Sequence, residues 1–163
     1  MNTPRANLIV APDEESARDE ALTSTVVGDH VFFVLPDSQA ASALAETFRD
    51  RDVLAASAGL DAGPLALVTS AVLAHGGVDR LVVVVRPQSG GVHECEPADL
   101  LDSFVAQPWD MLRAAAPFLR ERKGQVRFVV QGTDAGAELV RAALGALAQG
   151  WSAATGLDAQ LQR

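Results

Sequence analysis

The chain has 163 residues, 48% of them hydrophobic, which is enough for one domain with a buried core over residues 1–163. Its net charge of −8 argues against nucleic acid or an anionic membrane as a partner. No apolar run approaches the roughly 18 residues of a membrane-spanning helix. The only cysteine is Cys95 and the start has no signal-peptide pattern, so a cytoplasmic location without internal disulfides is expected.

The first half of the chain alternates apolar runs with helical patterns. Predicted strands cover 6–11, 29–36 and 52–57, and predicted helices cover 14–27, 37–51 and 62–77. Asp37 or Ser38 is expected to cap the second helix, because both side chains accept hydrogen bonds from free backbone N–H groups. Gly76 and Gly77 are expected to close the third helix.

The second half continues the same alternation. Predicted strands cover 79–87 and 124–132, and predicted helices cover 96–122 and 134–156. The continuous apolar run at 81–85 is typical of a central parallel strand that is covered on both faces. The helix over 96–122 is expected to bend near Pro108 and Pro117, and only a short tail follows the last helix.

Five strands alternating with helices predict an α/β domain. The expected fold is Rossmann-like and doubly wound, with three layers (αβα) around a parallel sheet. Right-handed crossovers place the strands in the order 3-2-1-4-5.

The turn after the first strand is acidic where a dinucleotide-binding fold carries glycines. Ala11, Pro12, Asp13, Glu14 and Glu15 stand there, whereas a pyrophosphate needs bare backbone N–H groups at a helix N-terminus. A carboxylate about 4 Å from a phosphate charge would repel it by about 4 kcal/mol at an effective dielectric constant near 20. We therefore expect standard dinucleotide binding to be excluded, and no cofactor is predicted.

Three passages resemble the short-chain dehydrogenases/reductases. "VDRLVVVVRP" (78–87) is similar to the family's fourth strand, and "LRAAAPFLRERKGQVRFVVQG" (112–132) to its long interface helix and fifth strand. "AELVRAALGALAQGWSAATG" (137–156) falls on the helix that carries the family's catalytic Tyr and Lys. The resemblance implies that the family's last strands would lie beyond residue 156, so the domain is expected to be truncated at its C-terminal end.

The family's functional residues are absent at the matching positions. The Asn-Ala-Gly after the fourth strand is replaced by Val85, Arg86 and Pro87. The family's catalytic Asn, Ser, Tyr and Lys fall near Phe104, near Gln131 or Gly132, on Ala137 and on Arg141. The sequence contains no tyrosine, and an always-protonated Arg cannot replace a phenol of tuned pKa. No catalytic residue is therefore predicted.

Other polar groups favour structural roles. The run His93–Glu96 is interpreted as an exposed loop rather than a metal site, because adjacent residues rarely converge on one ion. His30 and His75 are expected to be structural, and His75 lies near a helix C-terminus, which suits a cation. Residues 88–91 and 131–136 are interpreted as connections, the second a shortened turn. No metal site is predicted.

The last two long helices are the expected interaction surface. The resemblance implies that they pair with their counterparts in a second subunit, and the predicted interface residues are Trp109, Leu112, Phe118, Val140, Leu144, Ala148 and Trp151. The leading hypothesis is a non-catalytic subunit that pairs with an intact short-chain dehydrogenase/reductase or with itself. The alternative is a small-ligand binder or atypical enzyme at the carboxyl edge of the sheet, lined by Asp13, Glu14, Arg86, His93 and Asp134.

Overall fold

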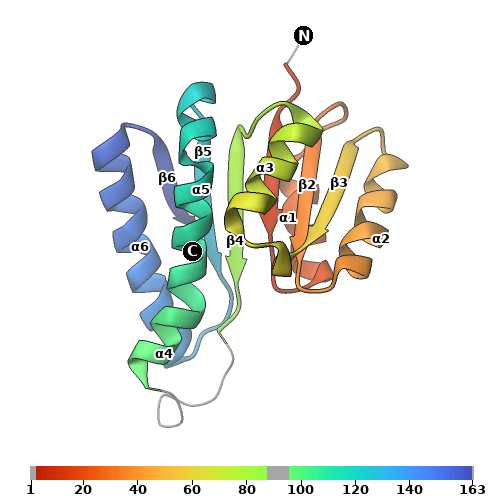
Figure 1. Ribbon diagram of the computed structural model, residues 1–163. Helices are drawn as coiled ribbons and strands as arrows, with labels where there is room; N and C mark the ends of the chain where they lie inside the picture. Colours follow the sequence, from red (N-terminus) through yellow and green to blue (C-terminus); the bar gives the residue numbers. More distant parts are fainter. Residues whose placement is uncertain (1–2, 88–95, 163) are drawn as a thin grey trace.

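A parallel sheet runs through the middle of the protein, with helices on both of its faces (Figure 1). The computed structural model describes residues 3–87 and 96–162. The strands are β1 (Ala6–Val10), β2 (His30–Leu35), β3 (Leu54–Gly59), β4 (Arg80–Val85), β5 (Gln125–Val130) and β6 (Asp158–Gln162). The helices are α1 (Glu14–Ser24), α2 (Ser38–Arg49), α3 (Pro64–His75), α4 (Pro97–Leu101), α5 (Gln107–Arg122) and α6 (Ala135–Thr155).

The strand order is β3-β2-β1-β4-β5-β6, and all neighbours are parallel. The predicted order of the first five strands is therefore confirmed. The sixth strand lies where the sequence predicts only a short tail, because D-A-Q-L-Q has only two apolar residues. Its alternating pattern is that of a strand with one polar face.

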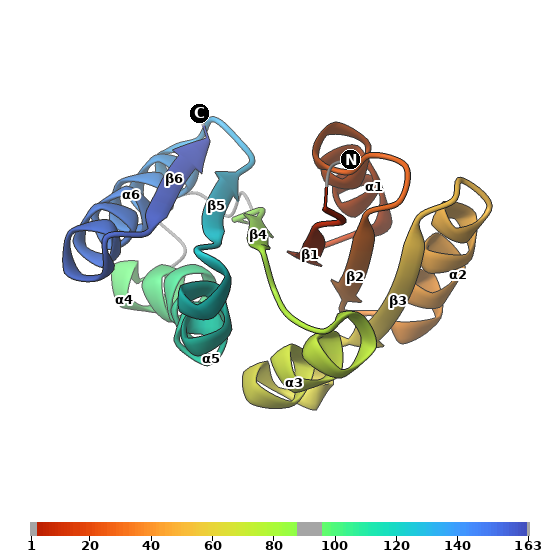
Figure 2. The same cartoon turned by 90° about the horizontal axis from the view of Figure 1, so that it is seen from above.

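Two apolar cores lie on opposite faces of the sheet. Helices α1 and α2 cover the core that contains Ile9, Phe33 and Val82. Helices α3, α5 and α6 cover the larger core, to which Leu8 and Phe128 belong (Figure 2). Strand β4 sends alternate side chains into both cores and is buried from Leu81 to Val85. This confirms the prediction of a central strand covered on both faces.

Three of the helices have an aspartate as their N-cap residue. The side chains of Asp13, Asp37 and Asp134 accept backbone hydrogen bonds from the first turns of α1, α2 and α6. This confirms the cap expected at Asp37. At the other end of α3, Gly76 has φ +77 and ends the helix in the left-handed conformation that glycine adopts without a steric penalty.

The predicted helix over 96–122 is continuous but changes its winding. A π-helical turn, Asp102–Ala106, joins α4 to α5. Pro108 follows this turn, and because proline has no N–H it cannot make the usual bond to the residue four positions earlier. Helix α5 continues through Pro117 without a break. Among the described residues, no helix combines the length and apolar character needed to cross a membrane.

Candidate functional site

The carboxyl ends of β1, β4 and β5 meet where the chain direction of the fold reverses. Strand β1 lies between β2 and β4, so the connections that leave β1 and β4 run to opposite faces of the sheet. In open α/β sheets this topological switch point is where ligands bind. Asp13 and Ser16 follow β1, Arg86 follows β4, and Gln131 follows β5.

These four residues form one hydrogen-bonded cluster centred on Arg86. The Arg86 guanidinium forms an ion pair with Asp13 and donates to Gln131 Oε1 at 2.9 Å and to Ser16 Oγ at 3.1 Å. Gln131 Nε2 also donates to Ser16 Oγ at 3.1 Å. We call this set, Asp13, Ser16, Arg86 and Gln131, the Arg86 cluster. It ties together the ends of three strands and the first turn of α1.

Asp13 occupies the anion position at the start of α1. Its Oδ1 accepts the Ser16 N–H at 2.8 Å, so the carboxylate takes a backbone donor that a phosphate would use at a helix N-terminus. Partial burial alone would raise the pKa of Asp13, but the Ser16 hydrogen bonds and the Arg86 guanidinium together lower it below its ordinary value. The carboxylate is therefore charged at neutral pH, and Arg86 neutralises it.

The positions that the resemblance matches to reductase catalytic residues are buried or bonded within the chain. Ala137 is fully buried in the first turn of α6 and has no ionisable group. Arg141 forms an ion pair with Glu138 and donates to the carbonyl oxygens of Val130 and Gly132, so it holds the turn between β5 and α6. Phe104 is half-buried against the larger core.

The residues proposed for an alternative ligand site are mostly engaged within the chain. Glu14 forms an ion pair with Arg18, and Asp134 caps α6 through the Ala137 N–H at 2.8 Å. His93 and the rest of the segment 88–95 lie outside the described residues. Within the described residues, no three His, Cys, Asp or Glu side chains converge as metal ligands.

His75 is structural, but it does not suit the cation that its place near a helix end suggested. Its Nε2 lies 3.1 Å from the Val31 carbonyl oxygen, and its ring centroid lies 5.1 Å from that of His30. Burial lowers the pKa of His75, and the nearby His30 lowers it further, whereas the Val31 contact opposes this shift. Burial is the largest of these causes, so the neutral ring is favoured.

Five of the seven predicted interface residues lie inside the chain's own core. Leu112, Val140 and Leu144 are 0% exposed, and Ala148 and Trp151 are 2% and 8% exposed. The apolar spacing identified the face of α6 that packs on the sheet, because a face that packs internally and one that binds a partner have the same period. Trp109, at 38% exposure, and the half-buried Phe118 reach the surface.

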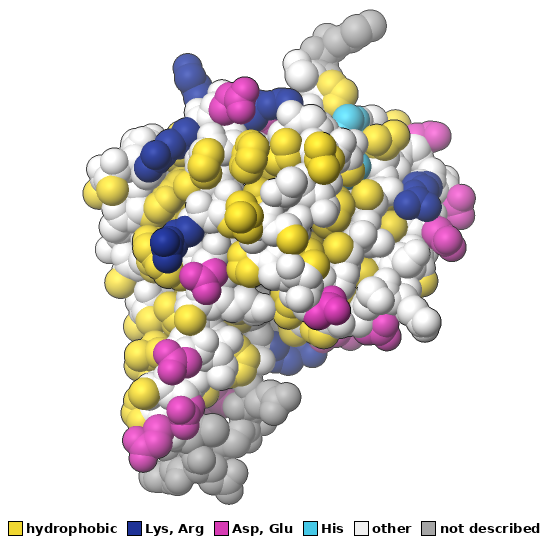
Figure 3. Space-filling model, in the orientation of Figure 1, with side chains coloured by type: hydrophobic (Ala, Val, Ile, Leu, Met, Phe, Trp, Pro, Cys, Tyr) yellow, Lys and Arg dark blue, Asp and Glu magenta, His cyan; other side chains and the backbone are white. Residues whose placement is uncertain are grey.

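Other exposed apolar residues lie outside the predicted interface set. Leu65 and Leu73 on α3 are 69% and 82% exposed, and Leu139 on α6 is 36% exposed. Hydrophobic side chains gather on the face of the molecule formed by α3 and α5 (Figure 3). The absence of Asp, Glu, Lys and Arg from α3 could have indicated this surface.

The strand order and the position of the Arg86 cluster define a class: a doubly wound α/β protein with its polar groups at the switch point. Solved structures narrow the class further. The chain has the fold of short-chain dehydrogenases/reductases, as its similarity to several of them shows.

Three structures illustrate the similarity. An alcohol dehydrogenase from the archaeon Thermococcus sibiricus, solved with 5-hydroxy-NADP, has a TM-score of 0.75 at 14% identity, over 96% of this chain and 75% of that one. A short-chain dehydrogenase/reductase from Serratia marcescens has a TM-score of 0.70 at 23% identity, over 94% and 69%. Another from Saccharomyces cerevisiae has a TM-score of 0.73 at 20% identity, over 95% and 69%. No family model and no curated protein matches the sequence.

Proposed function

We propose that this protein is a non-catalytic subunit with a reductase fold that acts by associating with another protein chain. The observation that carries the proposal is the Arg86 cluster. The Asp13 carboxylate takes the Ser16 N–H, and Arg86 donates hydrogen bonds to Gln131 after β5 and to Ser16 after β1. Ligands of this class of fold bind in that space, so the cluster competes directly with a dinucleotide pyrophosphate.

The matching catalytic positions support the same proposal. Hydride transfer to a carbonyl needs a proton donor of tuned pKa close to the reacting oxygen. Ala137 stands where the resemblance implies the phenol, and the Arg141 guanidinium is already bonded to Val130, Gly132 and Glu138. A chain with these substitutions keeps its fold without these parts of the reductase chemistry.

Calorimetric titration with NADH and NADPH tests the proposal. We expect no saturable heat up to millimolar nucleotide, and no oxidation of either nucleotide with carbonyl substrates. As a positive readout, the native mass of the protein purified from its source should exceed that of the single chain. A nucleotide that binds with a micromolar dissociation constant, or hydride turnover by the purified chain, would overturn the proposal.

One observation favours a second function, the binding of a small ligand at the Asp13–Arg86 ion pair. The Asp13 and Arg86 side chains are 34% and 48% exposed, so the ion pair is open to solvent. A small zwitterion could insert between them, its ammonium group facing Asp13 and its carboxylate facing Arg86. Thermal shift with a panel of amino acids tests this function. Stabilisation that disappears in Arg86→Gln would favour it over the non-catalytic subunit.

A further inference from the structure

The outward side of α3 carries the most exposed leucine of the described residues. Leu73 is 82% exposed and Leu65 is 69% exposed, and no Asp, Glu, Lys or Arg lies in the helix. Figure 2 shows α3 at the outside of the helix layer that it forms with α5 and α6. Single exposed leucines are common on protein surfaces, but two on one side of an uncharged helix indicate a contact surface.

The exposed residues of α3 form two neighbouring rows, each with a spacing of four residues. The longer side chains form one row and the shorter ones the other: Leu65, Thr69 and Leu73, then Ala66, Ser70 and Ala74. We call these six residues the α3 face. The Thr69 hydroxyl donates to the Leu65 carbonyl oxygen at 2.7 Å, so it needs no partner outside the helix. In helix packing, a row of large side chains fits a groove on the other helix. The α3 face has both a ridge and a groove, so it is complementary to itself.

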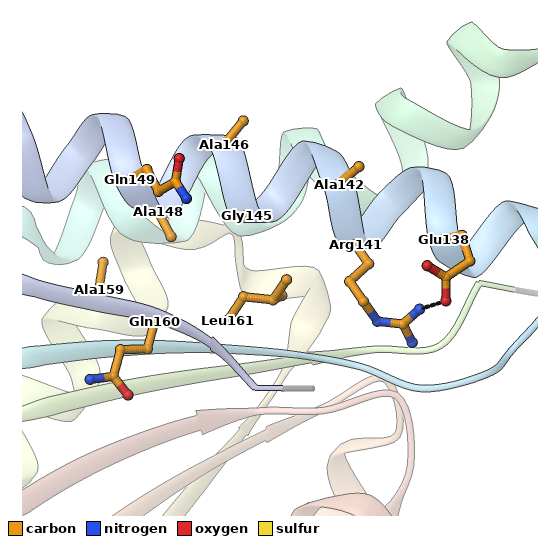
Figure 4. Close-up of a pocket in the computed structure, with 10 residues that line it drawn as sticks. All are labelled: Glu138, Arg141, Ala142, Gly145, Ala146, Ala148, Gln149, Ala159, Gln160 and Leu161. Atoms are coloured by element: carbon orange, nitrogen blue, oxygen red, sulfur yellow. Dashed lines mark hydrogen bonds and ion pairs between the residues drawn. The ribbon is translucent and has the colours of Figure 1, made fainter.

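The groove between α6 and β6 has a different character. Its volume is about 980 Å³, and Glu138, Arg141, Gln149 and Gln160 are among the residues that line it (Figure 4). Glu138 and Arg141 form an ion pair in its wall. A protein that covered this groove would remove these polar groups from water at a cost in free energy. The α3 face presents no such groups except hydroxyls, so it is the better apolar contact.

The two ends of α3 lie among opposite charges. The exposed Asp61 precedes the helix at the carboxyl edge of the sheet. At the other end, Arg122 donates to the Gly76 carbonyl oxygen at 2.7 Å, and the exposed Lys123 follows it. Asp79, 3.7 Å from Arg122, offsets only part of this positive charge. Two antiparallel α3 helices would set the acidic end of each copy beside the basic end of the other, whereas parallel helices would set like charges together.

We propose that two copies of this chain associate through their α3 faces, with the helices antiparallel about a two-fold axis between Thr69 and Ser70. This names the partner in the association proposed above and so rests on that proposal. Each leucine of one copy then lies against an alanine of the other, a large side chain against a small one. The interface is isologous, so every contact occurs twice.

The size of the contact sets its strength. A helix of 12 residues is about 18 Å long, so two α3 helices cover less surface than a standard protein interface. The dimer is therefore weak and dissociates on dilution. Its main anchors are the two leucines, because they lose the most apolar surface to the second copy.

Charge placed in the α3 face tests the proposal. Sedimentation of the full chain should show a concentration-dependent dimer, and Leu73→Glu and Leu65→Glu should each weaken it at least tenfold, because each puts a carboxylate into an apolar contact. Both positions are exposed, so the urea midpoint of the monomer should change little. Leu22→Glu is the matched control: Leu22 is a 47% exposed leucine on α1, on the other face of the sheet, and its replacement should leave association unchanged.

Disulfide cross-linking tests the direction of the helices. In a Cys95→Ser chain, Ser70→Cys should link two copies when oxidised glutathione is added, because residue 70 lies next to the axis. Ala66→Cys should not, because the two copies of this residue lie about 10 Å apart along antiparallel helices at 1.5 Å per residue. Parallel helices would link both variants.

Four outcomes would overturn the dimer. They are a chain that stays monomeric up to about 1 mM, complexes with another protein only, association that is unchanged by both leucine substitutions, and cross-linking at Ala66→Cys equal to that at Ser70→Cys. The proposed non-catalytic function fails by different results, which are nucleotide binding or hydride turnover. A monomeric chain that is found in a complex with another protein in its source would leave that function standing, so the two proposals fail separately.

Discussion

Asp13 is both the cap of α1 and the acidic half of the Arg86 cluster. Asp13→Ala removes the acceptor for the Ser16 N–H, and the loss of an N-cap costs about 1 kcal/mol of unfolding free energy. Asp13→Asn keeps an acceptor and loses only a half-exposed ion pair, so it should cost about 0.5 kcal/mol or less. Urea denaturation at pH 7 measures both values.

A double-mutant cycle of Asp13→Asn with Arg86→Gln isolates the ion pair. Because the pKa of Asp13 is lowered in the folded chain, its contribution is present above the ordinary carboxyl pKa and is lost as pH falls through the folded value. The coupling free energy should therefore vanish in acid. Coupling that persists below pH 3 would mean that hydrogen bonds, not charge, join the pair.

His75 should make the protein less stable in mild acid. Its pKa is lowered in the folded chain, so in the range just below its ordinary value of 6.5 the unfolded chain binds more protons than the folded chain. The contribution of the neutral His75 ring to the unfolding free energy is fully present above pH 6.5 and is lost as the pH falls below that value. His75→Gln keeps a donor for the Val31 carbonyl oxygen, and its urea midpoint should depend less on pH between 5 and 7 than that of the wild-type chain.

His30 is the appropriate control for this prediction. His30→Asn removes the neighbouring ring at 5.1 Å, which lowers the pKa of His75 through its charge. The pH dependence should become smaller but should not disappear, since burial is the larger cause. If His75→Gln and the wild-type chain lose stability in parallel on acidification, another group controls this transition.

At the scale of elements, α6 has two apolar faces with different tasks. Leu144 is fully buried against the sheet, whereas Leu139 is 36% exposed. Leu144→Ala should cost about 2–5 kcal/mol of unfolding free energy because it leaves a cavity in the larger core. Leu139→Ala should change stability by about 0.5 kcal/mol or less. Equal losses at the two positions, measured by urea denaturation, would contradict this assignment.

The strands and helices could be predicted where burial dictates the sequence. Strand β4 is apolar at every position from Leu81 to Val85 because both of its faces are covered. This continuous apolar run can be recognised from the sequence alone. Strand β6 has one polar face and an open edge, so its two apolar residues are too weak a signal. Five of the seven predicted interface residues lie in the core for a related reason: periodicity identifies an apolar face but not which surface covers it.

The candidate site could be predicted only in part. The acids after β1 indicated that a phosphate would be repelled, and Asp13 lies at that position. The alternative ligand site placed Arg86 at the same edge as Asp13, and the two residues do form an ion pair. The contacts of Ser16 with Arg86 and with Gln131 could not be inferred, since these residues lie 70 and 115 positions apart in the sequence. Only the parallel pairing of β1, β4 and β5 brings them together.

Across the whole molecule, charge follows the helix dipoles. Asp13, Asp37 and Asp134 cap helix N-termini at the carboxyl edge of the sheet. At the opposite edge, Arg80 donates to the Ser24 carbonyl oxygen at the end of α1, and Arg122 to the Gly76 carbonyl oxygen after α3. Cations stabilise helix C-termini, so this basic edge is explained by the fold without any bound anion.

The net charge of −8 predicts how any self-association of the chain would depend on salt. Two chains of this charge repel each other at long range, and raising the ionic strength from 0.01 M to 0.1 M shortens the screening length from about 30 Å to about 10 Å. Copies that associate through apolar surface should therefore associate several-fold more tightly with added NaCl, as sedimentation at several protein concentrations would measure. Association that weakens with salt would instead be held by ion pairs between charged residues of the two copies.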